Sequence, residues 1–121
     1  MVARVRGMIR PEDLIRLRAN WERQRSVQGT KGEIDHEPVV RLYLPFSGCV
    51  WLLSELDEEG IAFGLCDLGV GCPELGYVAL LELEELRHPQ GLQVLQDVDF
   101  RPRMTIGEYA AIANSQGRIV A

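Results

Sequence analysis

The sequence has no apolar run that approaches the roughly 20 residues a helix needs to cross a membrane. Its first residues include arginines but lack the apolar segment that follows them in a signal peptide, so we expect no signal peptide. It has only three cysteines, an odd number without the spacing of a disulfide framework. Internal repeats and low-complexity segments are also absent. Together these absences argue against a secreted protein and predict a reduced, cytoplasmic one.

The sequence does contain enough apolar material for one folded domain. With 121 residues, 46% of them hydrophobic, it can bury about two-thirds of its unfolded surface. Charge is divided unevenly: residues 1–31 hold eight basic and three acidic residues, a net charge of +5, whereas residues 32–121 hold five arginines and fifteen acids, or −10. The simplest interpretation is that the basic helix packs on its own acidic body; the alternatives are an acidic surface for a basic partner and a basic arm for an acidic one.

The spacing of apolar residues predicts a helix at each end of the domain. Leu14, Leu17 and Trp21 recur at helical spacing with Ile15 beside them, which predicts a helix from Pro11 to about Val27. A capping-box pattern at 105–108 predicts a second helix that ends at about residue 116, before a glycine. Residues 1–8 are expected to form a leader that need not be ordered. A single α+β domain is expected to follow at 9–121.

Runs of β-branched and aromatic residues between these helices predict an antiparallel sheet of four to five strands. The segment 81–87 is interpreted as a short middle helix, although a strand would alternate similarly. Asp97 and Asp99 suggest that the last strand lies at an edge. The expected strands are 39–44, 49–56, 61–68, 76–80 and, less regular, 92–100.

A glycine-rich turn between the third and fourth strands is the first candidate for a pocket. Nucleotide binding is disfavoured there because the third glycine of the dinucleotide fingerprint is missing and no helix follows. A pair of carboxylates flanks the turn and could perform acid–base chemistry, but hydrogen bonding within the turn is the preferred explanation. The turn and pocket candidates are Asp67, Gly69, Gly71, Glu74 and Tyr77.

The sequence gives little indication of a metal site or of a reactive cysteine. Cys66 and Cys72 lie too far apart for a zinc knuckle, and no second pair exists to complete a site with Cys49, His36 or His88. Cysteines within strands are usually small core residues, and histidines in polar turns are usually solvated. We therefore expect no metal, no cofactor and no catalytic residue of this kind.

Two charged surfaces are candidates for binding a macromolecule. Acidic loops could oppose a basic channel of a protein partner, although solvated turns and helix faces are the simpler explanation. The partner-binding candidates are Asp57, Glu58, Glu59, Glu82, Glu84 and Glu85. Arginines of the first helix could bind nucleic acid, although most of the remaining charge is acidic. These nucleic-acid candidates are Arg16, Arg18, Arg23 and Arg25.

Three segments resemble the domain-of-unknown-function family 2958: Val50–Leu56, Ile61–Gly69 and Pro73–Val78. The segment Asp67–Tyr77, which reads Asp-Leu-Gly-x-Gly-x-Pro-Glu-Leu-Gly-Tyr, is long and specific. The resemblance extends from about residue 9 to residue 119. It implies a small bacterial cytoplasmic protein of plasmids, integrative elements and phages, often near antirestriction and DNA-transfer functions. It implies no established activity, cofactor or catalytic residue.

These observations leave three functions open. The first is a non-enzymatic interaction protein of a mobile genetic element that inhibits a host defence system, by anti-CRISPR or antirestriction action, through its acidic loops. The second is a small-ligand-binding protein or a hydrolase-like enzyme that uses the Asp67–Glu74 turn. The third is DNA binding through the N-terminal arginine-rich helix.

Overall fold

The computed structural model describes residues 7–121 and confirms the α+β arrangement. Residues 1–6, most of the expected leader, lie outside this range, and Met8 and Ile9 are buried in the core. The elements in chain order are α2 (Pro11–Arg25), β1 (Val40–Tyr43), β2 (Cys49–Leu56), β3 (Ile61–Leu68), β4 (Glu74–Ala79), α3 (Leu80–Glu85), β5 (Leu95–Gln96) and α4 (Ile106–Gln116).

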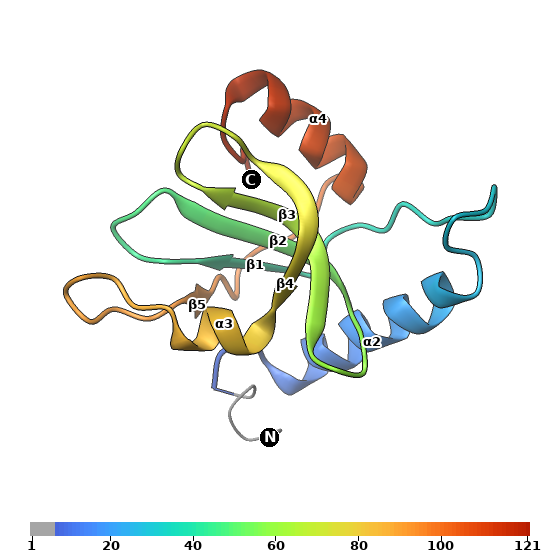
Figure 1. The fold of residues 1–121 in the computed structure, drawn as a ribbon, viewed down its shortest axis with the longest axis horizontal. Coiled ribbons are helices and arrows are strands. Elements are labelled where there is room, and N and C mark those ends of the chain that lie inside the picture. The colour runs from blue at the N-terminus through green and yellow to red at the C-terminus, as the bar shows by residue number, and fades with distance from the viewer. Residues whose placement is uncertain (1–6) are drawn as a thin grey trace.

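The five strands form one antiparallel sheet in the order β4-β3-β2-β1-β5 (Figure 1). The short connections predicted an antiparallel meander of β1, β2 and β3, and the strand pairing confirms it and adds β4 beside β3. Gly64 of β3 lies where the backbone of β2 comes close, since a Cβ there would be 2.0 Å from the carbonyl oxygen of Leu52. The register shifts beside this position, between Leu53 and Glu55. A glycine within this strand is therefore required by packing.

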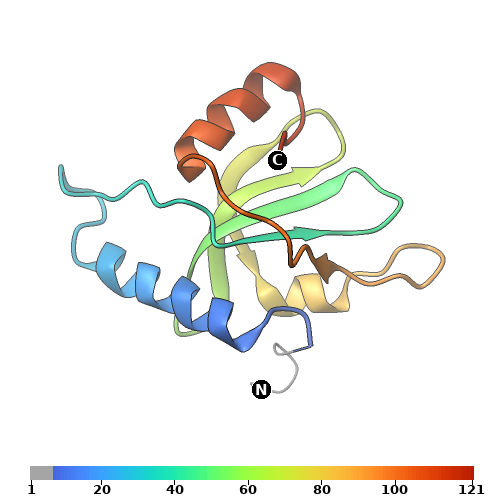
Figure 2. The same cartoon turned by 180° about the vertical axis from the view of Figure 1, so that it is seen from behind.

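The sheet is covered on both faces, which explains why β2 is apolar along its whole length. Trp51 and Leu53 face a core shared with α2 and α3, whereas Leu52 faces a second core shared with α4. Figures 1 and 2 show α4 on one side of the sheet and the other two helices on the opposite side. No helix within residues 7–121 combines the length and apolarity needed to cross a membrane.

On the second face of the sheet, the N-terminus of α4 is held by several hydrogen bonds. Thr105 and Glu108 form the predicted capping box, and Gly117 ends the helix with a positive φ of 74°. Asp35 adds a tether from a distant loop, because its carboxylate accepts hydrogen bonds from the Gly107 N–H at 2.9 Å and the Thr105 hydroxyl at 2.6 Å. Helix α4 is therefore capped at both ends, and its N-terminus is also tied to the loop that carries Asp35.

Two expectations were wrong in detail. Ile15 is 69% exposed, because the face of α2 that meets the sheet carries Asp13, Leu17 and Gln24 instead. Asp13 can be buried because Arg10, Arg16 and Gln96 all donate hydrogen bonds to it.

The expected strand at 92–100 is reduced to the two residues of β5. The chain turns immediately afterwards, where the Asp97 side chain accepts a hydrogen bond from the Asp99 N–H at 3.1 Å and the Asp97 carbonyl accepts one from the Phe100 N–H. The expectation of an edge position was correct.

Candidate functional site

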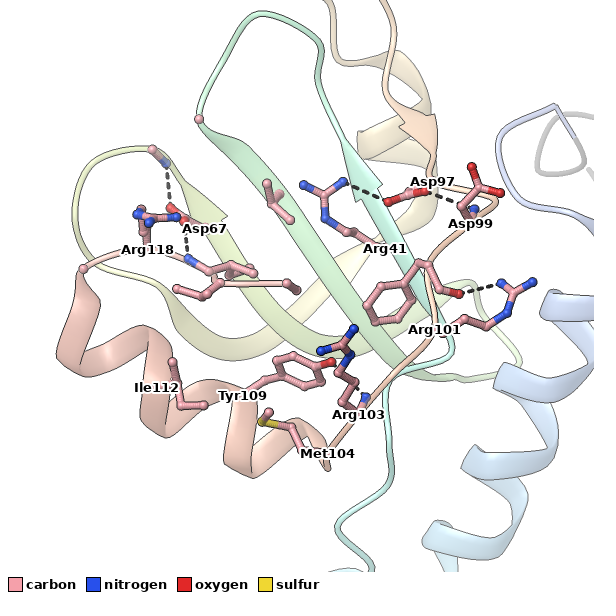
Figure 3. Close-up of a pocket in the computed structure, with 18 of the residues that line it drawn as sticks. Arg41, Asp67, Asp97, Asp99, Arg101, Arg103, Met104, Tyr109, Ile112 and Arg118 are labelled. Carbon is pink, nitrogen blue, oxygen red and sulfur yellow. Dashed lines mark hydrogen bonds and ion pairs between the residues drawn. The ribbon is translucent and has the colours of Figure 1, made fainter.

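A cleft of about 1050 Å³ lies between α4 and the sheet (Figure 3). Its walls come from the first half of β2, the β3–β4 turn, the segment 97–104, helix α4 and the last residues of the chain. Its floor is apolar. The floor residues are Val50, Phe100, Met104, Tyr109 and Ile119.

Four arginines and three aspartates line this cleft. Residues 32–121 contain only five basic residues, all arginines, and four of them line the cleft: Arg41, Arg101, Arg103 and Arg118. They come from β1, the 97–104 segment and the C-terminal segment, so tertiary folding brings them together. We call this feature the arginine cleft.

Asp67, at the end of β3, is the most buried carboxylate of the cleft, with 2% of its surface exposed. One carboxylate oxygen accepts a hydrogen bond from the Gly69 N–H at 2.8 Å, and the other accepts one from the Ile119 N–H at 2.9 Å. The side chain therefore fixes the β3–β4 turn and ties the C-terminal segment to the sheet. Because both oxygens are engaged by backbone amides, Asp67 shapes the wall of the cleft.

The second carboxylate, Asp97, pairs with Arg41 across the β1–β5 edge. The Arg41 guanidinium lies 3.4 Å from the Asp97 carboxylate and 5.4 Å from the centre of the Tyr43 ring. The Arg41 Nε atom is buried, and no described residue accepts a hydrogen bond from it. Arg41 is thus held in place by a weak ion pair and a cation–π contact, with one donor unused.

The other arginines present charge to solvent at the mouth of the cleft. Arg101 donates to the carbonyl oxygens of Val98 and Phe100, which keeps it close to its own turn. Within residues 7–121, Arg103 and Arg118 form no ion pair. The backbone N–H of Arg103 donates to the Tyr109 hydroxyl at 3.0 Å, so its backbone is fixed while its side chain is exposed.

The cleft therefore combines guanidinium groups with an apolar floor. A guanidinium presents a planar fork of donors that matches the two oxygens of a carboxylate or phosphate. An apolar floor favours a ligand that also has an apolar part. The arrangement is suited to hold an anionic group attached to an apolar body.

The residues predicted for the glycine-rich turn separate in the structure. Asp67, Gly69 and Gly71 line the arginine cleft. Glu74 is exposed on the edge strand β4. Tyr77 stacks on Phe63, with ring centres 5.1 Å apart, and its hydroxyl accepts a hydrogen bond from Gln28 at 3.3 Å. The proposed carboxylate pair thus does not share one pocket, because alternation along β4 and the turn carry Glu74 away.

The acidic candidates come together at the other end of the sheet. The Leu80 N–H at the start of α3 donates to the Gly60 carbonyl in the β2–β3 turn at 3.0 Å. Asp57 stabilises this turn, since its side chain accepts hydrogen bonds from the N–H groups of Glu59 and Ile61. We call this region the acidic end; its members are Asp57, Glu58, Glu59, Glu82, Glu84 and Glu85.

The arginines of α2 stay on the surface of that helix. Arg16 pairs with Asp13 at 3.3 Å, and Arg25 pairs with Glu22 at 3.6 Å and lies over the Trp21 ring. Both partners belong to the same helix. Arg18 and Arg23 are exposed, and Arg23 donates to Asn20. DNA binding by this helix stays a prediction.

The cysteines and histidines are dispersed. Cys66 packs against the core under α2 and α3, and burial raises the pKa of its thiol, so little reactive thiolate forms at neutral pH. Cys72 is exposed in the β3–β4 turn. No group of three or more histidine, cysteine or acidic side chains within residues 7–121 could hold a metal ion.

None of the four arginines of the cleft was among the candidate residues named from the sequence. In the sequence, Arg41 lies within an expected strand, and Arg118 lies beyond the expected end of the last helix and received no interpretation. The one local signal is the Arg101–Arg103 pair, spaced by a proline just after the edge strand. Nothing in the spacing of Arg41 and Arg118 indicates that they converge.

Comparison with known proteins identifies the family. The chain matches the family described as "Protein of unknown function (DUF2958)" over residues 8–120, nearly its whole length. The chain therefore belongs to this family, as its segments at 50–78 suggested. No curated protein and no solved structure matches it.

Proposed function

We propose that this protein is a non-enzymatic binding protein that holds an anionic group of its ligand in the arginine cleft. One observation supports this most strongly: a part of the chain with a net charge of −10 places four of its five basic residues around a single cleft. The two better-buried carboxylates there, Asp67 and Asp97, are already engaged by backbone amides and by Arg41. The exposed charged side chains at the opening are therefore three guanidinium groups and the single carboxylate of Asp99.

Titration calorimetry tests this proposal with citrate, a small carboxylate anion, as the probe. The variant R103Q/R118Q removes the two arginines that form no ion pair in the described chain. The matched control is R18Q/R87Q, which removes the same charge from exposed arginines outside the cleft. Because a charge-assisted hydrogen bond contributes about 1.5–3 kcal/mol, the cleft variant should bind citrate at least about tenfold more weakly. Equal affinities of the two variants would contradict the proposal.

The acidic end supports a second proposal: the protein acts in the bacterial cytoplasm for a mobile genetic element and inhibits a host defence system. In this role its carboxylates would oppose a basic nucleic-acid channel of an anti-CRISPR or antirestriction target. The observation that favours it is the hydrogen bond between Leu80 and Gly60, which joins two acidic segments into one surface.

A test of the second proposal should spare Asp57, because this side chain stabilises the β2–β3 turn. The variant E58Q/E59Q/E82Q/E85Q removes four charges from the exposed carboxylates of the surface. In cells that carry a restriction or CRISPR system, the native chain should protect incoming phage DNA and the variant should protect less. Equal protection by both would show that the acidic end is not the binding surface.

A further inference from the structure

Exposed apolar side chains surround the arginine cleft. Ile112 of α4 and Val120 of the C-terminal segment line it directly and are exposed. Phe46 and Val70 lie in the two turns that border it, and they are 87% and 74% exposed. These turns touch, because a Cβ on Gly48 would lie 3.0 Å from the Gly69 Cα atom, and both glycines line the cleft. We call these four residues the apolar rim.

Phe46 is the most unusual member of the rim. It is the only described non-glycine residue with a positive φ, at 58°. The β1–β2 turn fixes this conformation, since the Ser47 hydroxyl donates to the Leu44 carbonyl at 2.6 Å and accepts from the Cys49 N–H at 3.1 Å. A bulky side chain in this region is strained, and its exposure means that packing within the domain does not offset the strain.

We propose that the occupant of the arginine cleft is an acidic peptide segment of a protein partner, whose apolar side chains pack on the apolar rim. This inference rests on the proposed function and adds the class of the ligand. Aromatic and arginine residues are enriched at protein interfaces. The volume of the cleft, about 1050 Å³, is also slightly above the range of about 300–1,000 Å³ that is typical of pockets for one small molecule.

Charge in the cleft favours a peptide over a nucleic acid. A single-stranded nucleic acid needs a continuous positive groove for its phosphates. Here Asp97 and Asp99 lie among the arginines and would repel a regular array of phosphates. A peptide can place separate carboxylates beside Arg103 and Arg118, and its backbone N–H groups can donate to the exposed Asp99.

Selection from a random peptide library displayed on phage tests this inference with the full chain as bait. Enriched peptides should combine aspartate or glutamate with a large apolar residue close by in sequence. The best peptide, made synthetically with a fluorescent label, should bind R103Q/R118Q at least about tenfold more weakly than the native chain. It should also bind F46N several-fold more weakly, since asparagine tolerates the positive φ but removes the aromatic contact.

Citrate binding distinguishes a failure of the peptide inference from a failure of the proposed function. F46N should bind citrate as the native chain does, because the rim contributes nothing to a small anion. If citrate binds through the arginines but no acidic peptides are enriched, or if an oligothymidylate binds more tightly than any selected peptide, the peptide inference is wrong and the proposed function stands. If neither citrate nor any peptide depends on Arg103 and Arg118, both are wrong.

Discussion

The two ends of the sheet carry opposite charge for different structural reasons. At the arginine cleft, the carboxylates of Asp67 and Asp97 are engaged in holding turns and strands, so the guanidinium groups face solvent. At the acidic end, Asp57 stabilises a turn, and Glu58, Glu59 and Glu82 are exposed. Carboxylates are thus mainly structural at the cleft, where only Asp99 is exposed, and mainly exposed at the acidic end. The net charge of −10 for residues 32–121 does not indicate the arginine cleft, because a net charge counts buried and exposed groups equally.

The largest expected effect is a loss of stability when the buried carboxylate of the cleft is changed. D67N keeps the shape of the side chain but faces the Gly69 or Ile119 N–H with an NH2 group, which leaves a buried donor without an acceptor. The free energy of unfolding should fall by about 2–3 kcal/mol, measured by urea denaturation. The control D99N changes an exposed carboxylate of the same cleft and should shift stability by less than about 0.5 kcal/mol. Similar losses in both variants would mean that Asp67 is not the tether described.

The next effect concerns binding by the two ends. R103Q/R118Q should weaken citrate binding by about 1.4 kcal/mol or more, a factor of at least about ten. Raising the salt concentration should reduce the difference between this variant and the native chain, because the mouth of the cleft is exposed and its charges are screened. A difference that persists unchanged in about 1 M salt would indicate that the substitutions altered the fold rather than the charge.

A smaller effect on stability, opposite in sign to that of D67N, is expected at the apolar rim. F46N should raise the free energy of unfolding by about 0.5–1 kcal/mol, because asparagine adopts the left-handed conformation more readily than phenylalanine and little packing is lost. V70S is the comparison, an exposed change without relief of strain that should be nearly neutral. Thermal unfolding of the three chains measures this, and a lower midpoint for F46N would show that Phe46 stabilises its turn.

The smallest effect tests whether the two ends act independently. E58Q/E59Q/E82Q/E85Q should change citrate affinity by less than about twofold, because charges beyond the Debye length of about 8 Å at physiological salt are largely screened. Calorimetry under the same conditions as for the arginine variants makes the comparison direct. A change as large as that of R103Q/R118Q would mean that citrate also responds to the acidic end.

Local patterns predicted most of the fold. The bounds of β2 and β3 and the capping box of α4 agree with the structure, because each depends on neighbouring residues. Ile15 was misassigned because helical spacing alone cannot show that a polar side chain, Asp13, takes the buried position when Arg10 and Arg16 satisfy it.

The candidate site was predictable only in part. The glycine-rich turn indicated Asp67, Gly69 and Gly71, which line the cleft, since a turn keeps its own residues together. Arg41 and Arg118 could not be predicted, because their convergence depends on strand order and on the hydrogen bond that ties Ile119 to Asp67. A site assembled from separate elements leaves no local pattern.

The most direct test of the cationic cleft is an NMR titration with citrate that follows the side-chain Nε–Hε signals of the arginines. We predict that the signals of Arg41, Arg103 and Arg118 shift together along one binding curve, while those of Arg16, Arg18 and Arg23 on α2 stay in place. Shifts confined to the arginines of α2, or equal shifts of all arginines without saturation, would contradict this prediction.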